Sequence, residues 1–427
     1  MQMYIVLAVT LFMMVMFIWH KFPFGVTTMT CCFVLAATGC ITLGQAYSGF
    51  GNKIVVLIAP MLAMSNVLTR TALVGNISTM LNALKGKQGI LLILAFYAVG
   101  IVFAQFIPTT AAIAILVVFL STLGNTGEIT ANRMLMPLLG VMVAWKFRTP
   151  IGLGATTFAQ LNAYAEGILG EDTPYTIQML DPFKFAIIPG VLLTIYCLLC
   201  WKLMPKIDTL NTEELEKKNK AADLLPQSKQ TIVYIVFIAV MATMLLNTWT
   251  GDLMYLAPAA GVLVLIYTGC MSVPEAVKGM TVDMTWMLAG VLVVSDAIGA
   301  SGAGQMIGDA LLKVLGGMNS PFLVCMVFSI VTVVMTTFIS NMGTQSVLIP
   351  IAASVALAGG WDPRGLILII GTANYMAIAF PSGSGEAAVA FAAGGYNPAK
   401  VLKFTLPFII ISVIGCTLSA YLFYPPV

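Results

Sequence analysis

The chain has 427 residues, of which 59% are hydrophobic and only 9% are charged, with a formal net charge of +3. Soluble domains carry about 25% charged residues, so this chain cannot cover a water-exposed surface. The mean hydropathy is +0.98, and apolar runs near the length of a membrane span recur along the sequence. This composition predicts an all-α polytopic membrane protein and excludes a soluble enzyme, a nucleic-acid binder and a membrane β-barrel.

Twelve apolar segments follow one another, six on each side of one long hydrophilic run at 206–230. This run predicts a cytoplasmic linker between two domains, at 1–205 and 231–427. The first six segments lie at 3–19, 26–44, 53–68, 89–121, 133–168 and 184–203. The second six lie at 231–249, 253–270, 283–298, 320–357, 365–395 and 403–425.

The two halves resemble one another in the order of their features. An offset of about 231 residues aligns Pro150 with Pro381, and Phe106 with Phe338. Each half also carries a short amphipathic piece, at 72–85 and at 303–315, which we expect to lie in the membrane interface. The pattern predicts an internal repeat.

The fourth segment of each half, at 89–121 and 320–357, is too long for one comfortable crossing, which needs about 20 residues. Each segment has a polar cluster at its centre, around Thr109 and around Asn341. A re-entrant helical hairpin that turns inside the membrane explains both features. A single long helix with a hydroxylated face is the alternative.

The fifth segments, 133–168 and 365–395, are interrupted by proline, glycine and hydroxyl residues near Pro150 and Pro381. Such an interruption frees backbone carbonyls and amides, which membrane proteins tolerate only against protein or a watery cavity. One interruption alone is explained by an ordinary proline kink. Two broken helices at corresponding positions are typical of a transporter binding site.

If each hairpin is re-entrant, every half crosses the membrane five times, so about ten crossings are expected and the two repeats have opposite orientations. With the linker in the cytoplasm and both termini outside, 14 of the 20 Lys and Arg residues fall on the cytoplasmic side. Four fall outside and two lie at membrane depth. The positive-inside rule therefore favours this orientation. We expect the membrane to be the bacterial inner membrane.

The run from Thr336 to Ile351 (TTFISNMGTQSVLIPI) resembles the second Ser-Asn-Thr hairpin of the divalent anion/sodium symporter family, within the ion transporter superfamily. The run from Phe380 to Glu386 (FPSGSGE) lies where that family has its second helix break, and the run from Thr149 to Gly154 (TPIGLG) is similar to its first. The resemblance implies a homodimer that moves its transport domain as an elevator and couples a dicarboxylate, tricarboxylate or sulfate to sodium.

The resemblance also implies which residues bind. The second sodium site takes Ser340, Asn341, Gly343 and Gly383, with Thr336 as a further contributor, and Gly152 belongs to the first. Candidate substrate contacts at the hairpin tips, the breaks and the adjacent basic pair are Thr109, Thr110, Lys146, Arg148, Ser340, Asn341, Gly343, Thr344, Ser382 and Ser384. The helix ends there would aim unpaired amides at an anion.

Two positions depart from the family pattern. The asparagine of the first hairpin is replaced, because the sequence reads Pro108-Thr109-Thr110, and Met342 stands where the second motif has its threonine. These changes affect the first sodium site and the hydroxyl contact to a dicarboxylate.

Three ionisable residues at apparent depth, Lys146, Arg148 and Glu386, need a reason, because a buried charge is costly unless it is paired. Either basic residue could contact the anion, or replace the first sodium as a fixed cation. Glu386 could instead form an ion pair with one of them. Asp296 is a further candidate, for a proton site or for capping and pairing.

The function favoured by the sequence is secondary active transport of a small anion, coupled to sodium and without any other cofactor. Sodium-independent exchange, and proton-coupled transport or efflux within the same superfamily, are the alternatives. A third possibility, from a different functional class, is an anion channel or a membrane subunit of a larger complex. The sequence contains no Walker motif, acidic metal cluster or catalytic triad, so we expect no enzyme.

Overall fold

The computed structural model describes residues 2–19, 21–72, 90–121, 130–170, 172–205, 224–314, 320–338 and 340–425. Within these ranges the chain is helical and has no strand, as the composition predicts. In this described part of the chain, six helices are long and apolar enough to cross a membrane, or seven if one bent pair is counted as a single span. Six further apolar helices have 10–17 residues. The number of ten crossings stays a prediction.

The first half begins with α1 and ends with a short 3-10 turn after α10. The predicted long segment at 89–121 is two helices, α6 and α7, separated at Ile107 and Pro108. The described α-helices of the first half are α1 (Gln2–Trp19), α2 (Phe24–Ala37), α3 (Leu43–Ser48), α4 (Lys53–Leu68), α6 (Ile90–Phe106), α7 (Thr109–Ser121), α8 (Ala131–Trp145), α9 (Thr157–Leu169) and α10 (Asp181–Cys200).

The second half repeats this order. The segment at 320–357 is again two helices, α18 and α19. The described α-helices of the second half are α12 (Gln227–Leu245), α13 (Asn247–Thr250), α14 (Leu253–Tyr267), α15 (Val273–Met280), α16 (Asp283–Ala300), α17 (Ala303–Val314), α18 (Pro321–Phe338), α19 (Asn341–Ala358), α20 (Arg364–Ala373), α21 (Gly385–Gly394) and α22 (Pro398–Phe423). The predicted amphipathic piece at 303–315 is α17, whereas 73–85 and most of the linker, 206–223, lie outside the described residues.

Local geometry repeats between the halves as well. The N-terminus of α3 carries a capping box made by Thr42 and Gln45, and that of α15 carries one made by Ser272 and Glu275. In both boxes the hydroxyl accepts from the backbone amide three residues on, and the longer side chain accepts from the cap amide. The repeated order agrees with an internal repeat, while its inverted orientation stays a prediction.

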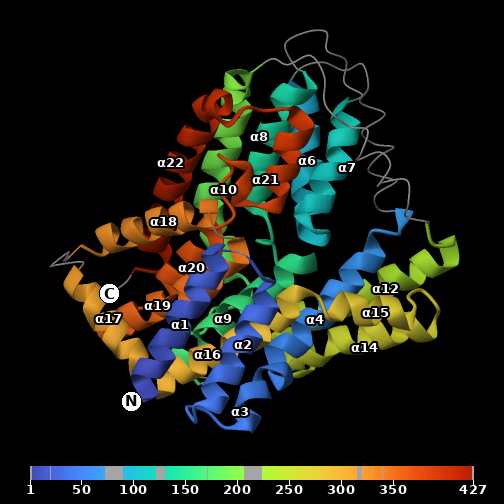
Figure 1. The fold of residues 1–427 in the computed structure, drawn as a ribbon. Helices are drawn as coiled ribbons and strands as arrows, with labels where there is room; N and C mark the ends of the chain where they lie inside the picture. The colour runs from blue at the N-terminus through green and yellow to red at the C-terminus, as the bar shows by residue number, and fades with distance from the viewer. Residues whose placement is uncertain are drawn as a thin grey trace.

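The helices form two groups, seen one above the other in Figure 1. In one group α8 packs against α6, α7, α10 and α21, and in the other α16 packs against α2 and α9. Both predicted broken helices pass between the groups. The first consists of α8, a 3-10 turn (η2, Gly152–Thr156) and α9, and the second consists of α20, another turn (η4, Pro381–Gly383) and α21.

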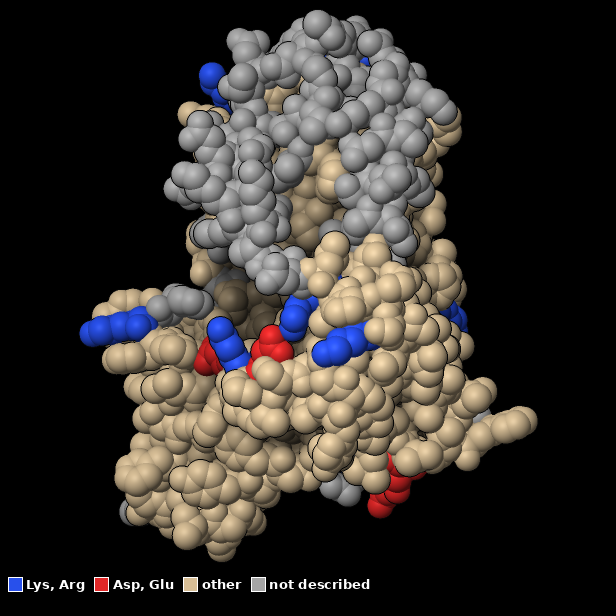
Figure 2. Space-filling model, turned by 90° about the vertical axis from the view of Figure 1, so that its right-hand side faces the viewer, with Lys and Arg blue, Asp and Glu red and all other residues tan. Residues whose placement is uncertain are grey.

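The outer surface is apolar. Large side chains such as Leu199 on α10, Ile238 on α12 and Leu256 on α14 are more than half exposed. In Figure 2 the described charged side chains gather in a band across the middle of the face, and most of the remaining described surface is uncharged. Such a surface is suited to lipid, in agreement with the predicted membrane location.

Candidate functional site

A cavity of about 320 Å³ lies between the two groups of helices, at the two breaks. Four helices begin at its wall. These are α7 with Thr109 and Thr110, α9 with Thr156 and Thr157, α19 with Ser340 and Asn341, and α21 with Ser384, Gly385 and Glu386. Unpaired backbone amides and the helix dipole favour negative charge at the starts of α7, α19 and α21. The helix α9 instead continues the turn η2, and the amide of Thr157 donates to the carbonyl of Gly154. The three helix ends of α7, α19 and α21 can therefore bind an anion.

Serine residues cap two of the helices that begin at the cavity. Ser340 is the N-cap residue of α19, and its hydroxyl accepts from the amide of Gly343 at 3.1 Å. Ser384 caps α21 in the same way and accepts from the amide of Ala387 at 3.1 Å. Both N-cap serines line the cavity. Gly343 and Thr344 follow in α19 and lie behind the wall, and the Thr344 hydroxyl is fully buried. The side chain of Ser382 lies outside the described set.

Lys146 and Glu386 form an ion pair on the cavity wall. The ammonium nitrogen of Lys146 lies 2.6 Å from Oε1 of Glu386, and the two side chains are 8% and 5% exposed. The ammonium also lies 4.4 Å from the centre of the Tyr375 ring, a cation–π contact. Pairing with Glu386 was one of the three readings open from the sequence, and the structure selects Lys146 as the partner.

Arg148 lies behind the wall and does not line the cavity. It is 1% exposed, and its Nη2 donates to the carbonyl oxygens of Gly371 at 2.7 Å and Thr372 at 3.3 Å. These carbonyls belong to the last turn of α20, where a cation complements the negative end of the helix dipole. The structure thus places Arg148 as a cap of the second broken helix.

Lys146 and Arg148 point differently because the residue between them has a left-handed backbone. Phe147 has φ of 55°, which is rare for a residue other than glycine. Its ring lines the cavity and meets Tyr375 edge-on, with ring centres 6.2 Å apart. This turn sends Lys146 to the cavity and Arg148 to α20.

Gln105 near the end of α6 holds the first break in place. Its Nε2 donates to the carbonyl of Trp145 at 2.7 Å, and its Oε1 accepts from the amide and the hydroxyl of Thr149 at 3.2 and 2.8 Å. Gly152 has φ of +61°, and a Cβ added there would lie 2.2 Å from the carbonyl oxygen of Gln105. Gly152 therefore packs against α6 and does not line the cavity.

Oxygen atoms converge at the second break. The hydroxyl of Thr336 donates to the carbonyl of Asn374 at 2.7 Å, and its oxygen lies 2.9 Å from the side-chain amide of Asn341. In one orientation of the Asn341 amide, its nitrogen donates to the carbonyls of Asn374 at 2.8 Å and Gly383 at 3.3 Å. The predicted residues Thr336, Asn341 and Gly383 thus lie together, and Asn374 joins them.

Two other predicted residues differ in where they lie. Asp296 lies exposed on α16 and lines a different cavity with Gln2 and Gln45. Thr109 lines the main cavity, and its buried hydroxyl has no hydrogen-bond partner among the described residues.

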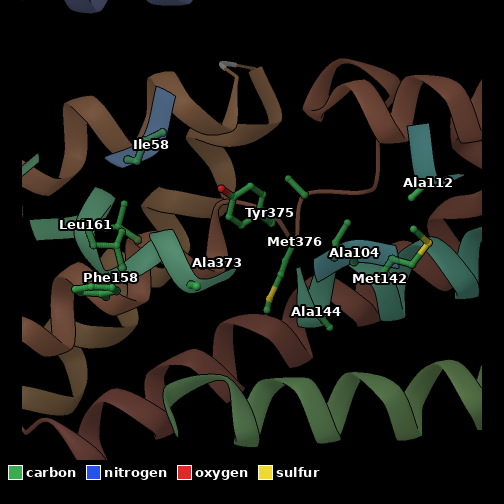
Figure 3. Packing of buried hydrophobic residues seen from close by; sticks show 14 of the residues in the cluster. Ile58, Ala104, Ala112, Met142, Ala144, Phe158, Leu161, Ala373, Tyr375 and Met376 are labelled. Atoms are coloured by element: carbon green, nitrogen blue, oxygen red, sulfur yellow. The ribbon is translucent and has the colours of Figure 1, made fainter. Parts of the chain in front are cut away.

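The sequence reasoning missed Asn374, Tyr375 and Gln160, which all belong to the site. Figure 3 shows Tyr375 and Met376 beyond the end of α20, between Phe158 and Leu161 of α9 on one side of the view and Ala104 of α6 on the other. Gln160 lines the cavity and donates to Oε1 of Gln345 at 3.0 Å. Asn374 was recognisable as an amide in an apolar segment seven residues before the Pro381 break.

Comparison with known proteins then decides the family. The family model described as citrate transporter matches residues 14–371. The chain belongs to the citrate transporter family. The resemblance to the divalent anion/sodium symporter family is also confirmed by a relative, the sodium-dependent dicarboxylate transporter SdcS of Staphylococcus saprophyticus. SdcS is 22% identical, over 99% of this chain and 86% of its own length.

Two further matches agree. The uncharacterized transporter sll0640 of Synechocystis is 25% identical over 39% of this chain, and the aligned part spans only about a quarter (27%) of that protein. The crystal structure of the YdaH transporter of Alcanivorax borkumensis superposes with a TM-score of 0.64 at 12% identity, covering 97% of this chain and 99% of that one. This match shows a shared fold. The family and these relatives are transporters and not enzymes.

Proposed function

We propose that the protein is a secondary active transporter of a small organic anion with two or three carboxylates, and that the cavity at the breaks is its substrate site. The observation that carries this proposal is the convergence of the N-termini of α7, α19 and α21 on one cavity whose wall also holds the ammonium of Lys146. Helix ends and an ammonium together recognise carboxylates without needing a second basic residue. A volume of about 320 Å³ suits a small molecule.

We further propose that sodium is the coupling ion and binds where Thr336, Asn341, Asn374 and Gly383 meet. Unwound carbonyls and short polar side chains are the sodium ligands of transporters with broken helices. In one orientation of its side chain, the Asn341 amide nitrogen donates to the carbonyls of Asn374 and Gly383 at 2.8 and 3.3 Å. Rotation of this amide by a half turn brings Oδ1 beside the same carbonyls and the Thr336 hydroxyl, so that four oxygen atoms face one ion.

The alternative is a sodium-independent exchanger, or a proton-coupled or efflux transporter, in which a fixed cation replaces one sodium. Two observations support replacement of one sodium by a fixed cation. The first hairpin has Thr109 in place of the family's asparagine, and Lys146 holds a positive charge on the wall of the same cavity. Arg148, the other residue considered for this role, lies behind the wall. The alternative therefore rests on Lys146.

Uptake into proteoliposomes tests the proposal and separates it from the alternative. Purified protein is reconstituted, and uptake of labelled citrate and succinate is measured with an inward sodium gradient, with choline in its place, and with an inward proton gradient. Uptake that requires sodium supports the proposal. Equal uptake in choline refutes sodium coupling and favours the alternative, and no uptake of either anion under any gradient refutes the proposed substrate class.

Other aspects of the mechanism rest on the family resemblance. We propose an elevator movement, a homodimer, and a bacterial inner membrane location with both termini outside and 206–230 in the cytoplasm. Cysteine labelling from either side of the membrane tests the orientation. The native cysteines must first be replaced, and a single cysteine placed near the C-terminus is then expected to react with an impermeant reagent added outside.

A further inference from the structure

The cavity wall holds one positive and one negative side chain among its described residues, and each neutralises the other. Lys146 follows α8 in the first half, and Glu386 lies in the first turn of α21 in the second half. Their charged atoms are 2.6 Å apart, with little exposure of either side chain. No other Asp, Glu, Lys or Arg lines this cavity in the part of the chain that the structure describes. An arriving carboxylate therefore finds its cation already occupied.

We propose that Glu386 is the resident counter-ion of Lys146, which holds the ammonium while the cavity is empty and yields it to a carboxylate of the substrate. This inference rests on the proposed function of the cavity. Two carboxylates cannot both occupy the same short contact with the ammonium, so the substrate and Glu386 compete for it. Release of the substrate restores the internal pair.

The carboxylate of Glu386 stays partly stabilised when its ion pair with Lys146 is broken, because of its position in a helix. It lies in the first turn of α21, whose N-cap is Ser384. A carboxylate at this position is stabilised by the free amides and the dipole of the helix. The charged groups near it are limited, since α21 packs against α7, α8 and η4, and Lys146 is the basic residue that reaches it from these described elements.

The pair has a consequence for the transport cycle. A carrier that performs net transport must return with its cavity empty, whereas an exchanger always returns loaded. A buried cation without a counter-ion is strongly unfavourable away from water. With Glu386 present, Lys146 is compensated in both the empty and the loaded state. Without it, only the loaded state is compensated, and the empty carrier should return slowly.

The test compares two fluxes in proteoliposomes, using labelled succinate or citrate. Net uptake is measured into empty vesicles, and exchange is measured into vesicles loaded with the same unlabelled anion. In Glu386→Gln the ratio of exchange to net uptake is expected to rise at least about tenfold over the wild type. In the double variant Lys146→Met, Glu386→Gln, which has no charge to compensate, the ratio is expected to return to within about threefold of the wild type.

Glu275→Gln is the matched control. Glu275 forms an ion pair with Arg70 at 2.8 Å on the exposed surface, and glutamine preserves its capping box. Its flux ratio should equal that of the wild type. If Glu386→Gln fails to fold, Glu386→Asp withdraws the carboxylate by one methylene and should raise the ratio at least about threefold.

The results separate the two proposals. Net uptake and exchange that fall by the same factor in Glu386→Gln, or an unchanged ratio in Glu386→Asp, overturn the counter-ion role. A double variant that keeps the raised ratio overturns it as well. A wild-type protein that neither takes up nor exchanges the two anions refutes the proposed function itself.

Discussion

Gln105 is predicted to hold the first break, and replacing it tests whether the break shapes the substrate site. The side chain is 2% exposed and links α6 to Trp145 and Thr149 through its amide. Gln105→Met preserves the volume but removes these hydrogen bonds. The amide of Thr149 then loses the acceptor at 3.2 Å, while the carbonyl of Trp145 still accepts from the amide of Arg148 at 3.3 Å.

The magnitude follows from one orphaned buried donor. An unsatisfied buried N–H costs about 1–3 kcal/mol, and the Thr149 hydroxyl can turn to another acceptor, so we expect a destabilisation of about 2 kcal/mol. Because Leu153, Thr156 and Thr157 of the same break line the cavity, we also expect the KM for the transported anion to rise. The assays are thermal unfolding of the purified protein in detergent and concentration-dependent uptake.

Gln230→Met is the matched control. Gln230 is also buried, donates to the carbonyl of Leu225 at 2.6 Å and accepts from the amide of Ala72 at 2.8 Å, but it does not line the cavity. It should lower stability to a similar degree and leave KM unchanged. Equal stability of Gln105→Met and the wild type, or an equal KM in all three proteins, would refute the role given to Gln105.

The remaining predictions concern the ion site, the basic residues and a glycine. Thr336→Val should raise the sodium concentration for half-maximal uptake about tenfold. The control Thr332→Val removes a buried hydroxyl that donates to a carbonyl of its own helix at 2.7 Å, and it should leave this concentration unchanged. Equal effects of the two substitutions would contradict the sodium site. Lys146→Met should raise the KM for the anion at least about tenfold, and Arg148→Met less than about threefold; the reverse order in uptake kinetics would contradict the placement of the two side chains. Gly152→Ala should prevent accumulation of folded protein, judged by size-exclusion chromatography, because its Cβ would lie 2.2 Å from a carbonyl oxygen; normal yield would contradict this packing.

The sequence predicted where the helices are interrupted more accurately than where the side chains point. The polar centre of 89–121 coincides with the end of α6 at Phe106 and the start of α7 at Thr109. This could be predicted because length and composition alone require an interruption there. Prolines and glycines near Pro150 and Pro381 likewise mark η2 and η4.

The orientation of Lys146 and Arg148 could not be predicted in the same way. They are two positions apart in an irregular segment, where neither helical nor strand periodicity applies. The left-handed backbone of Phe147 separates them, and nothing in a phenylalanine side chain indicates that conformation. Tyr375 was missed for a related reason, since it lies beyond the regular part of α20 and contacts Lys146 only in the folded protein.

The most direct test of the central claim, that the cavity at the breaks binds a carboxylate together with sodium, is ligand-dependent thermal stability of the purified protein. Citrate, succinate, sulfate and a monocarboxylate are each added with sodium or with choline. A ligand present at about 100 times its dissociation constant adds about 2.7 kcal/mol to the free energy of unfolding. We predict stabilisation by a di- or tricarboxylate in sodium, with a much smaller effect in choline and in Lys146→Met. Equal stabilisation of the wild type and Lys146→Met, or no stabilisation by any of these anions, would contradict the account.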